Sequence, residues 1–138
     1  MKSQFHDLLE SVPAGAFDCI YSISVLEHVP ADGMLGVFRG LSRFLKPSGV
    51  SIHAVDHVHR GNGASEHLAG LRLLAEGFGF SQADLEGTLK RLTEDTETYY
   101  LSAESHNRWR GGMSYDEFPM RVCPSIHFIS GAEQIQEI

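Results

Sequence analysis

The chain is poor in cysteine and lacks long apolar runs. Its two cysteines, Cys19 and Cys123, are far apart and fit no metal-ligand spacing. We therefore expect reduced thiols in a cytoplasmic protein, and no disulfide framework. No apolar run approaches the roughly 20 residues that a membrane-spanning helix needs, and the first residues lack the apolar core of a signal peptide. We expect no membrane partner.

Basic residues are also few. Eleven Lys and Arg stand against eighteen Asp and Glu, and the formal net charge is −7. Proteins that bind nucleic acids cluster Lys and Arg to neutralise phosphates, so we expect no nucleic-acid partner. A length of 138 residues leaves room for one domain with a real core and hardly for two, which predicts a single domain over residues 1–138.

The periodicity that is present indicates an α/β fold. Residues 17–23 form a short, near-continuous apolar run, typical of a strand that is buried on both faces. Apolar residues then recur every three or four positions across residues 30–46, which predicts a helix that ends at the Pro47-Ser48-Gly49 turn. Residues 50–55 read as a second strand. Two strands joined through such a helix should be parallel.

The flanking segments are less regular. We expect a short amphipathic helix over residues 4–12 and a loop over 57–65, followed by a helix over 66–76. Ser81 and Asp84 have the spacing of a capping box and open a helix that continues to Leu92. Residues 95–115 are polar, and residues 121–129 predict an edge strand.

Candidate functional residues follow the two central strands. Ligands of open α/β sheets bind at the carboxyl ends of the strands. Glu27 and His28 follow the first strand, and His57 follows the second. A carboxylate can orient an imidazole, and an imidazole can accept a proton near pH 7. The structural alternative is that Glu27 only favours a helix amino terminus through its charge.

The histidines allow a second interpretation. His53, His57 and His59 with Asp56 could form a zinc or iron site, because imidazole and carboxylate suit both metals. Solvated or hydrogen-bonded histidines are the simpler reading, so we predict no metal.

Two stretches of sequence carry a resemblance to a known family. They are FDxIxSxxVLEHV, which begins at Phe17, and LKPxG, which begins at Leu45. Their order and separation resemble the fourth-strand to fifth-strand region of class I S-adenosylmethionine-dependent methyltransferases. The resemblance implies a partial Rossmann-like methyltransferase sheet, without the first three strands and the Gly-rich motif.

The resemblance also implies a cofactor and site residues. S-adenosylmethionine would be the cofactor, with Ser22, Ile23 and Ser24 beside its methionyl part. Glu27, His28 and His57 would be the catalytic residues, and the acceptor would be an oxygen or nitrogen of a small molecule. Some ubiquinone-pathway O-methyltransferases bind a metal through Glu-x-x-Glu-His, but Ser24 stands where the first Glu would be.

Two further expectations concern partners. Arg108 and Arg110 resemble part of a bacterial subgroup of these enzymes and could hold a substrate carboxylate or phosphate, although such residues are often only surface charges. The alternative function is a non-catalytic remnant that acts as an oligomerising module. Half a sheet would expose a strand edge and an apolar face, which favours a homo-oligomer or pairing with a missing amino-terminal half.

Overall fold

The structure is a computed structural model of the whole chain. The residues that it describes are 11–57, 64–95, 98, 100–109, 112–118, 121–122 and 125–135, with only the backbone described at Trp109. The helix expected over residues 4–12 lies almost wholly outside this part. Among the described residues, no helix is long and apolar enough to cross a membrane.

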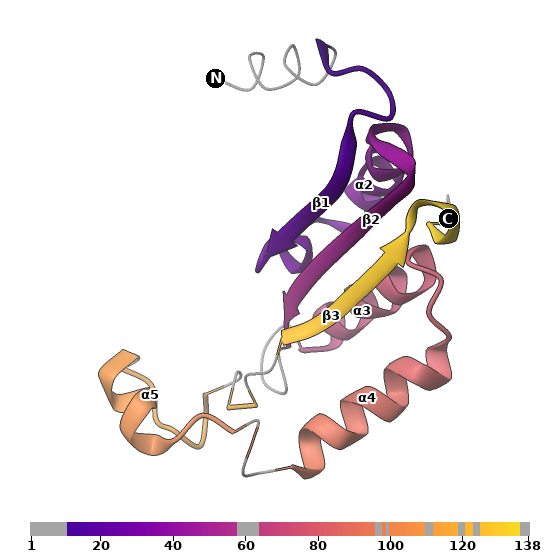
Figure 1. Cartoon of the computed structure of the whole chain (residues 1–138). Coiled ribbons are helices and arrows are strands. Elements are labelled where there is room, and N and C mark those ends of the chain that lie inside the picture. The colour runs from indigo at the N-terminus through magenta and orange to yellow at the C-terminus, as the bar shows by residue number, and fades with distance from the viewer. Residues whose placement is uncertain are drawn as a thin grey trace.

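A three-stranded sheet forms the centre of the molecule (Figure 1). Strand β1 (Phe17–Ile23) pairs in parallel with β2 (Leu45–Asp56), and β3 (Ser125–Gly131) pairs with β2 in the antiparallel direction. The parallel strand–helix–strand unit is therefore confirmed, and β3 is an edge strand as expected. This mixed α/β sheet is consistent with a partial Rossmann-like methyltransferase fold.

Helix α2 (Ala31–Phe44) connects the two parallel strands. Its spaced apolar residues point to the core, where Met34, Phe38 and Leu41 are buried. Strand β2 begins at Leu45, directly after α2 ends at Phe44. Phe17 pairs with Leu45, but Cys19, two residues further along β1, pairs with Val50, five residues further along β2. The expectation of a turn before the second strand is therefore wrong, because residues 46–49 bulge within β2.

Two helices follow β2. Helix α3 (Ala64–Gly77) packs on α2, and the approach at Gly77 is so close that a Cβ there would lie 2.1 Å from the Phe38 ring. Helix α4 (Gln82–Glu94) begins where the capping box predicts, because the Ser81 hydroxyl oxygen accepts a hydrogen bond from the Asp84 backbone N–H at 3.1 Å. Only glycine allows the α2–α3 contact, whereas α4 is set by local sequence.

Helix α5 (Ala103–Trp109) was not expected, since its sequence has no apolar period. Figure 1 shows it apart from the sheet, beyond the carboxyl ends of β1 and β2. Its His106 is buried between Tyr115 and Phe118, with ring centroids 5.6 and 5.1 Å away. A small aromatic cluster thus holds this segment together. Two 3₁₀ turns complete the described elements, η1 (Leu26–His28) and η2 (Ala132–Gln134).

The two faces of the sheet differ. Helices α2 and α3 lie behind the sheet in Figure 1, and on that side the alternate residues of β2 and β3 are buried. We call the other side the bare face; its residues are Cys19, Tyr21, Ile23, Val50, Ile52, Ala54, His127 and Ile129. Tyr21 is 72% exposed and Ile129 is 55% exposed. The expectation that the first strand is buried on both faces is therefore wrong.

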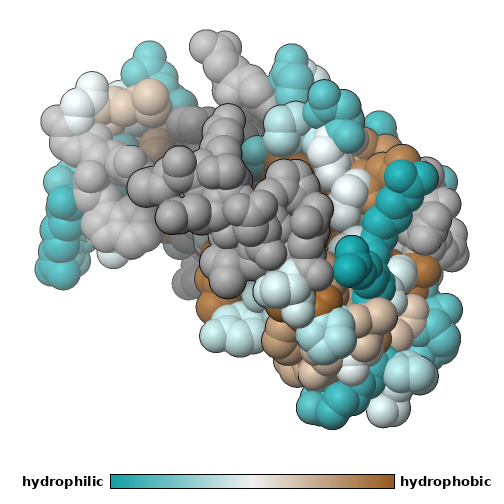
Figure 2. Space-filling model, turned by 90° about the horizontal axis from the view of Figure 1, so that it is seen from above, coloured by the Kyte–Doolittle hydropathy of each residue, from teal (hydrophilic) through white to brown (hydrophobic). Residues whose placement is uncertain are grey.

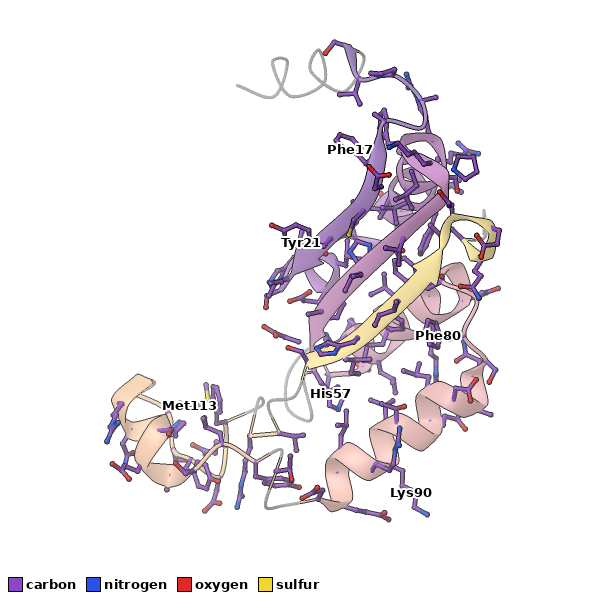
Figure 3. All side chains as sticks on the ribbon, viewed as in Figure 1. Phe17, Tyr21, His57, Phe80, Lys90 and Met113 are labelled. Atoms are coloured by element: carbon purple, nitrogen blue, oxygen red, sulfur yellow. The ribbon has the colours of Figure 1, made fainter. Side chains whose placement is uncertain are left out.

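The side chains can be followed in two views. Tyr21 extends from β1 in Figure 3, and His57 lies at the far end of the sheet. Seen from above, teal hydrophilic side chains alternate with brown hydrophobic ones on the described surface (Figure 2).

Candidate functional site

The carboxyl ends of β1 and β2 bring several titratable side chains together. Turn η1 follows β1 and contacts both β2 and α3. It therefore places Glu27 and His28 near the end of β2, where Asp56 and His57 stand, and near the first turn of α3, which carries His67. We call these five residues the polar cluster.

The turn that leaves β1 has an unusual backbone. Ser24 has a φ of +52°, in the left-handed region that non-glycine residues seldom adopt. Its backbone N–H donates a hydrogen bond to the Ala54 carbonyl oxygen at 2.9 Å, which fixes the turn to β2. A strained residue at the carboxyl end of a sheet is a reason to look for function there.

The predicted cofactor residues point in different directions. The Ser22 hydroxyl lies 2.7 Å from Nδ1 of His53, on the helix-covered side of the sheet. The Ile23 side chain is 66% exposed and belongs to the bare face. The Ser22 side chain is therefore engaged with His53, and the Ile23 side chain faces outward; their role in cofactor binding stays a prediction.

His53 supports the sheet and takes no part in the polar cluster. It is 2% exposed, and its ring stacks on Phe78 at a centroid distance of 5.0 Å. Burial lowers the pKa of His53 to about 4, so the imidazole is neutral at pH 7.

Glu27 has the least satisfied side chain of the polar cluster. Its side chain is 5% exposed, and neither carboxylate oxygen has a hydrogen-bond partner among the described residues. Nε2 of His28 is 4.0 Å from Oε1 of Glu27. That distance exceeds a hydrogen bond, so Glu27 does not orient His28 in the way the sequence suggested.

The imidazoles of the cluster differ in exposure. The His28 side chain is 78% exposed, whereas His57 is buried beside His67, with ring centroids 5.8 Å apart. Burial lowers the pKa of His67; His28 lowers it further, and the Asp56 carboxylate raises it. His67 is therefore neutral at pH 7, and His28 is the imidazole most open to a substrate.

Sequence reasoning missed His67. It lies beyond the loop that follows β2, so its distance along the chain hides its nearness to the strand end. The topological rule could have found it, because the first turn of a helix that follows a parallel strand returns to the carboxyl edge of the sheet.

The structure does not bring the predicted arginines to this cluster. Arg108 is exposed and forms an ion pair with Glu104 one turn away on α5. Arg110 lies outside the described residues. Their role in substrate binding stays a prediction.

Metal ligands were the other interpretation of the histidines. In the described part of the chain, no group of three or more His, Cys, Asp or Glu side chains is arranged to hold a metal ion. His53 and His57 are separated into the core and the polar cluster, and His59 lies outside the described residues.

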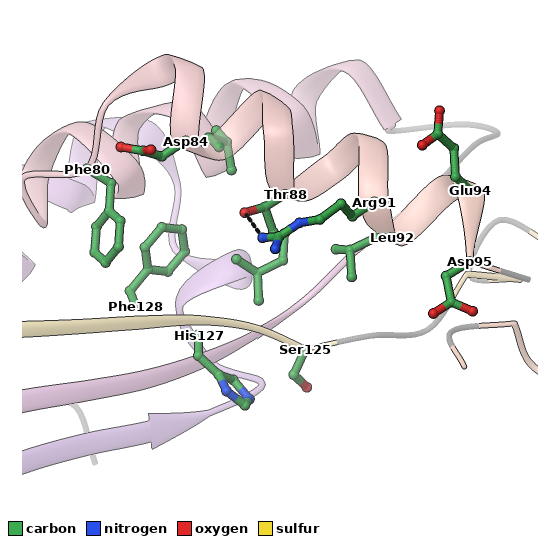
Figure 4. Close-up of a pocket in the computed structure, with 12 residues that line it drawn as sticks. Phe80, Asp84, Thr88, Arg91, Leu92, Glu94, Asp95, Ser125, His127 and Phe128 are labelled. Carbon is green, nitrogen blue, oxygen red and sulfur yellow. Dashed lines mark hydrogen bonds between the residues drawn. The ribbon is translucent and has the colours of Figure 1, made fainter. Parts of the chain in front are cut away.

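A large groove lies elsewhere in the described part of the chain. A groove of about 1060 Å³ runs between α4 and β3, with Phe80 and Phe128 at one end and Glu94 and Asp95 at the other (Figure 4). The Arg91 guanidinium crosses it and donates to the Thr88 hydroxyl at 3.2 Å. No residue of the polar cluster lines this groove.

Comparison with known proteins identifies the first part of the chain. The family model described as a methyltransferase domain matches residues 2–53. This segment is therefore similar to part of a class I S-adenosylmethionine-dependent methyltransferase domain. The match includes β1, η1, α2 and most of β2, and it contains Ser22, Glu27 and His28. No curated protein and no solved structure matches the chain.

Proposed function

We propose that the chain acts in methyl transfer from S-adenosylmethionine to an oxygen or nitrogen of a small molecule. The observation that carries this proposal is the overlap of two findings: the methyltransferase match at residues 2–53 and a polar cluster at the carboxyl ends of the strands that the match contains. Ligands of this class of sheet bind at that edge.

The residues present fit the positively charged end of this cofactor. When bound, S-adenosylmethionine supplies a methyl group on a sulfonium, a cation. The unpaired carboxylate of Glu27 is a matching countercharge, and the backbone around Ser22 to Ser24 would hold the methionyl part.

The protein's part in the reaction is positioning and proton removal. The acceptor's nucleophilic atom must approach the methyl carbon in line with the breaking bond, and holding it there is a large part of the catalysis. His28 is exposed and can accept the proton that an acceptor hydroxyl or amine loses as its bond to the methyl group forms. His57, which is buried, would line the inner side of the acceptor site.

Calorimetric titration of the chain with S-adenosylmethionine tests this function. We expect saturable binding that a matched variant, His28→Asn, retains, because His28 acts on the acceptor. A heat signal no larger than that of buffer dilution at high cofactor concentration would contradict the proposal.

The bare face supports a second role, self-association with a second copy of the chain. Parallel strands such as β1 and β2 are normally covered on both faces, yet here the bare face holds an apolar hollow of about 270 Å³ beside Tyr21 and Ile52. None of the eight bare-face residues is Asp, Glu, Lys or Arg. The alternation of β2 continues to Asp56 at the end of the strand, so two copies can approach without opposing like charges only through the part of the face before it.

Sedimentation equilibrium tests the second role. The wild-type chain should dimerise, and Ile23→Asp should weaken the dimer, since it would bury a charge in the contact. The control is Arg39→Asp, at an exposed position of α2. It makes the net charge more negative away from the bare face and should change the dimer far less. A wild-type chain that stays monomeric at high concentration would contradict self-association.

A further inference from the structure

The feature that the proposed function leaves unexplained is the isolation of the Glu27 carboxylate. Both of its oxygens are buried and lack a hydrogen-bond partner among the described residues. Burying an unpaired carboxylate costs several kcal/mol. The His28 side chain is 78% exposed, and its Nε2 lies 4.0 Å from Oε1 of Glu27. Local packing therefore gives no reason for a carboxylate at this position.

The position of Glu27 suggests what its charge acts on. It lies three residues beyond Ser24, on the turn that contacts both β2 and α3. A charge influences a ligand across several ångström without touching it, and a poorly hydrated charge is screened less than one in water. Any ligand at the carboxyl ends of β1 and β2 would lie within the field of Glu27.

We propose that Glu27 makes the site selective for a sulfonium over a neutral thioether. This inference rests on the proposed function and names Glu27 as a specificity-determining residue for the cofactor. S-adenosylmethionine carries the positive sulfonium, whereas its demethylated product, S-adenosylhomocysteine, carries an uncharged thioether. The carboxylate therefore strengthens the binding of the loaded cofactor, and this attraction is lost once the methyl group has left, because the product has no positive charge.

The other charged groups around the site set the conditions of the test. Asp56 adds a second carboxylate at the end of β2, and it stays constant in every variant. His28, His57 and His67 would oppose a cation if protonated, so the binding is measured at about pH 8, above the ordinary histidine pKa of about 6.5.

The test compares the dissociation constants of both ligands by calorimetry. The wild-type chain should bind S-adenosylmethionine at least about tenfold more tightly than S-adenosylhomocysteine, a ratio that a charge pair in a partly buried site can supply. Glu27→Gln, which keeps shape and removes charge, should bring the ratio close to one by weakening only the sulfonium ligand. Glu27→Asp, which keeps the charge, should retain most of the preference.

The matched control is Asp32→Asn. Asp32 is an exposed carboxylate in the first turn of α2, so its removal changes net charge equally without touching the buried position. It should keep the wild-type ratio. Circular dichroism and urea unfolding of each variant show that the fold is intact.

The outcomes separate the two proposals. If the wild-type chain binds both ligands equally, or if Glu27→Gln keeps the wild-type ratio, the selectivity of Glu27 is wrong while the cofactor function stands. If neither ligand binds the wild-type chain, the proposed function itself is contradicted, and the inference falls with it.

Discussion

The two faces of the β1–β2–β3 sheet are built from the same strands, but one is buried and the other is exposed. On the helix-covered face, Val55 is fully buried and Phe128 is 2% exposed. On the bare face, the neighbouring Ile52 and Ile129 are 40% and 55% exposed. The helix-covered side is the more polar of the two, since it carries Ser51, His53 and Ser130, so the position of the helices and not apolar composition decides which residues form the core. One face stabilises the fold, and the other is available for association.

The largest expected effect is on the covered face. Phe38→Ala should lower the free energy of unfolding by about 3–5 kcal/mol, because it leaves a cavity against Phe78, whose ring lies 5.2 Å away by centroids. Urea unfolding measures this. Tyr21→Ala, a similar truncation on the bare face, should cost far less in the monomer. Equal losses in the free energy of unfolding of the two variants would contradict the difference between the covered face and the bare face.

Acid should weaken the covered face through His53. Burial lowers its pKa to about 4, from 6.5 in the unfolded chain, so between these values the unfolded chain binds the extra proton. The stabilisation is complete above about pH 6.5 and is lost as the pH falls toward 4, by up to about 3 kcal/mol.

His53→Gln is the control for this pH dependence. Glutamine can keep a hydrogen bond to Ser22 and does not titrate, so the variant should lose less stability than the wild type between pH 7 and 4. Parallel stability–pH curves for the two proteins would contradict the assignment to His53.

Substitution by alanine should have opposite effects on stability at two glycines of α3. Gly77→Ala should destabilise the fold by about 1–3 kcal/mol, because its Cβ would meet the Phe38 ring. Gly70→Ala, on the same helix with open space around it, should instead raise stability by up to about 1 kcal/mol. Thermal unfolding distinguishes them, and a stabilising Gly77→Ala would show that α2 and α3 are not in close contact.

The smallest effect on folding is expected on the bare face. Ile129→Ser should change the free energy of monomer unfolding by less than about 0.5 kcal/mol, as is usual for exposed positions. Urea unfolding at low protein concentration measures this. A loss above about 2 kcal/mol would mean that the bare face is part of the monomer core.

Much of the fold could be predicted where the pattern was local. The apolar spacing gave α2 its place, and the Ser81 cap marked the start of α4. Helix α5 could not be predicted, because its residues show no apolar period and it is held by contacts around His106. The bare face was equally hidden, since Tyr21 and Ile23 read like residues of a buried strand whatever covers them.

The site was predicted in part for the same reason. Glu27, His28 and His57 follow strand ends, and the topological rule marks them directly. The Ser22–His53 pair depends on the register between β1 and β2, and the isolation of Glu27 depends on packing against α3. Neither can be read from one strand at a time.

The most direct test of the central claim is to observe the polar cluster while cofactor is added. In an NMR titration with S-adenosylmethionine, we predict that the imidazole resonances of His28, His57 and His67 shift with one common dissociation constant. The resonance of His106, buried in the separate aromatic cluster, should stay unchanged. A titration that leaves the three cluster imidazoles unmoved would contradict a methyl-transfer site at the carboxyl ends of β1 and β2.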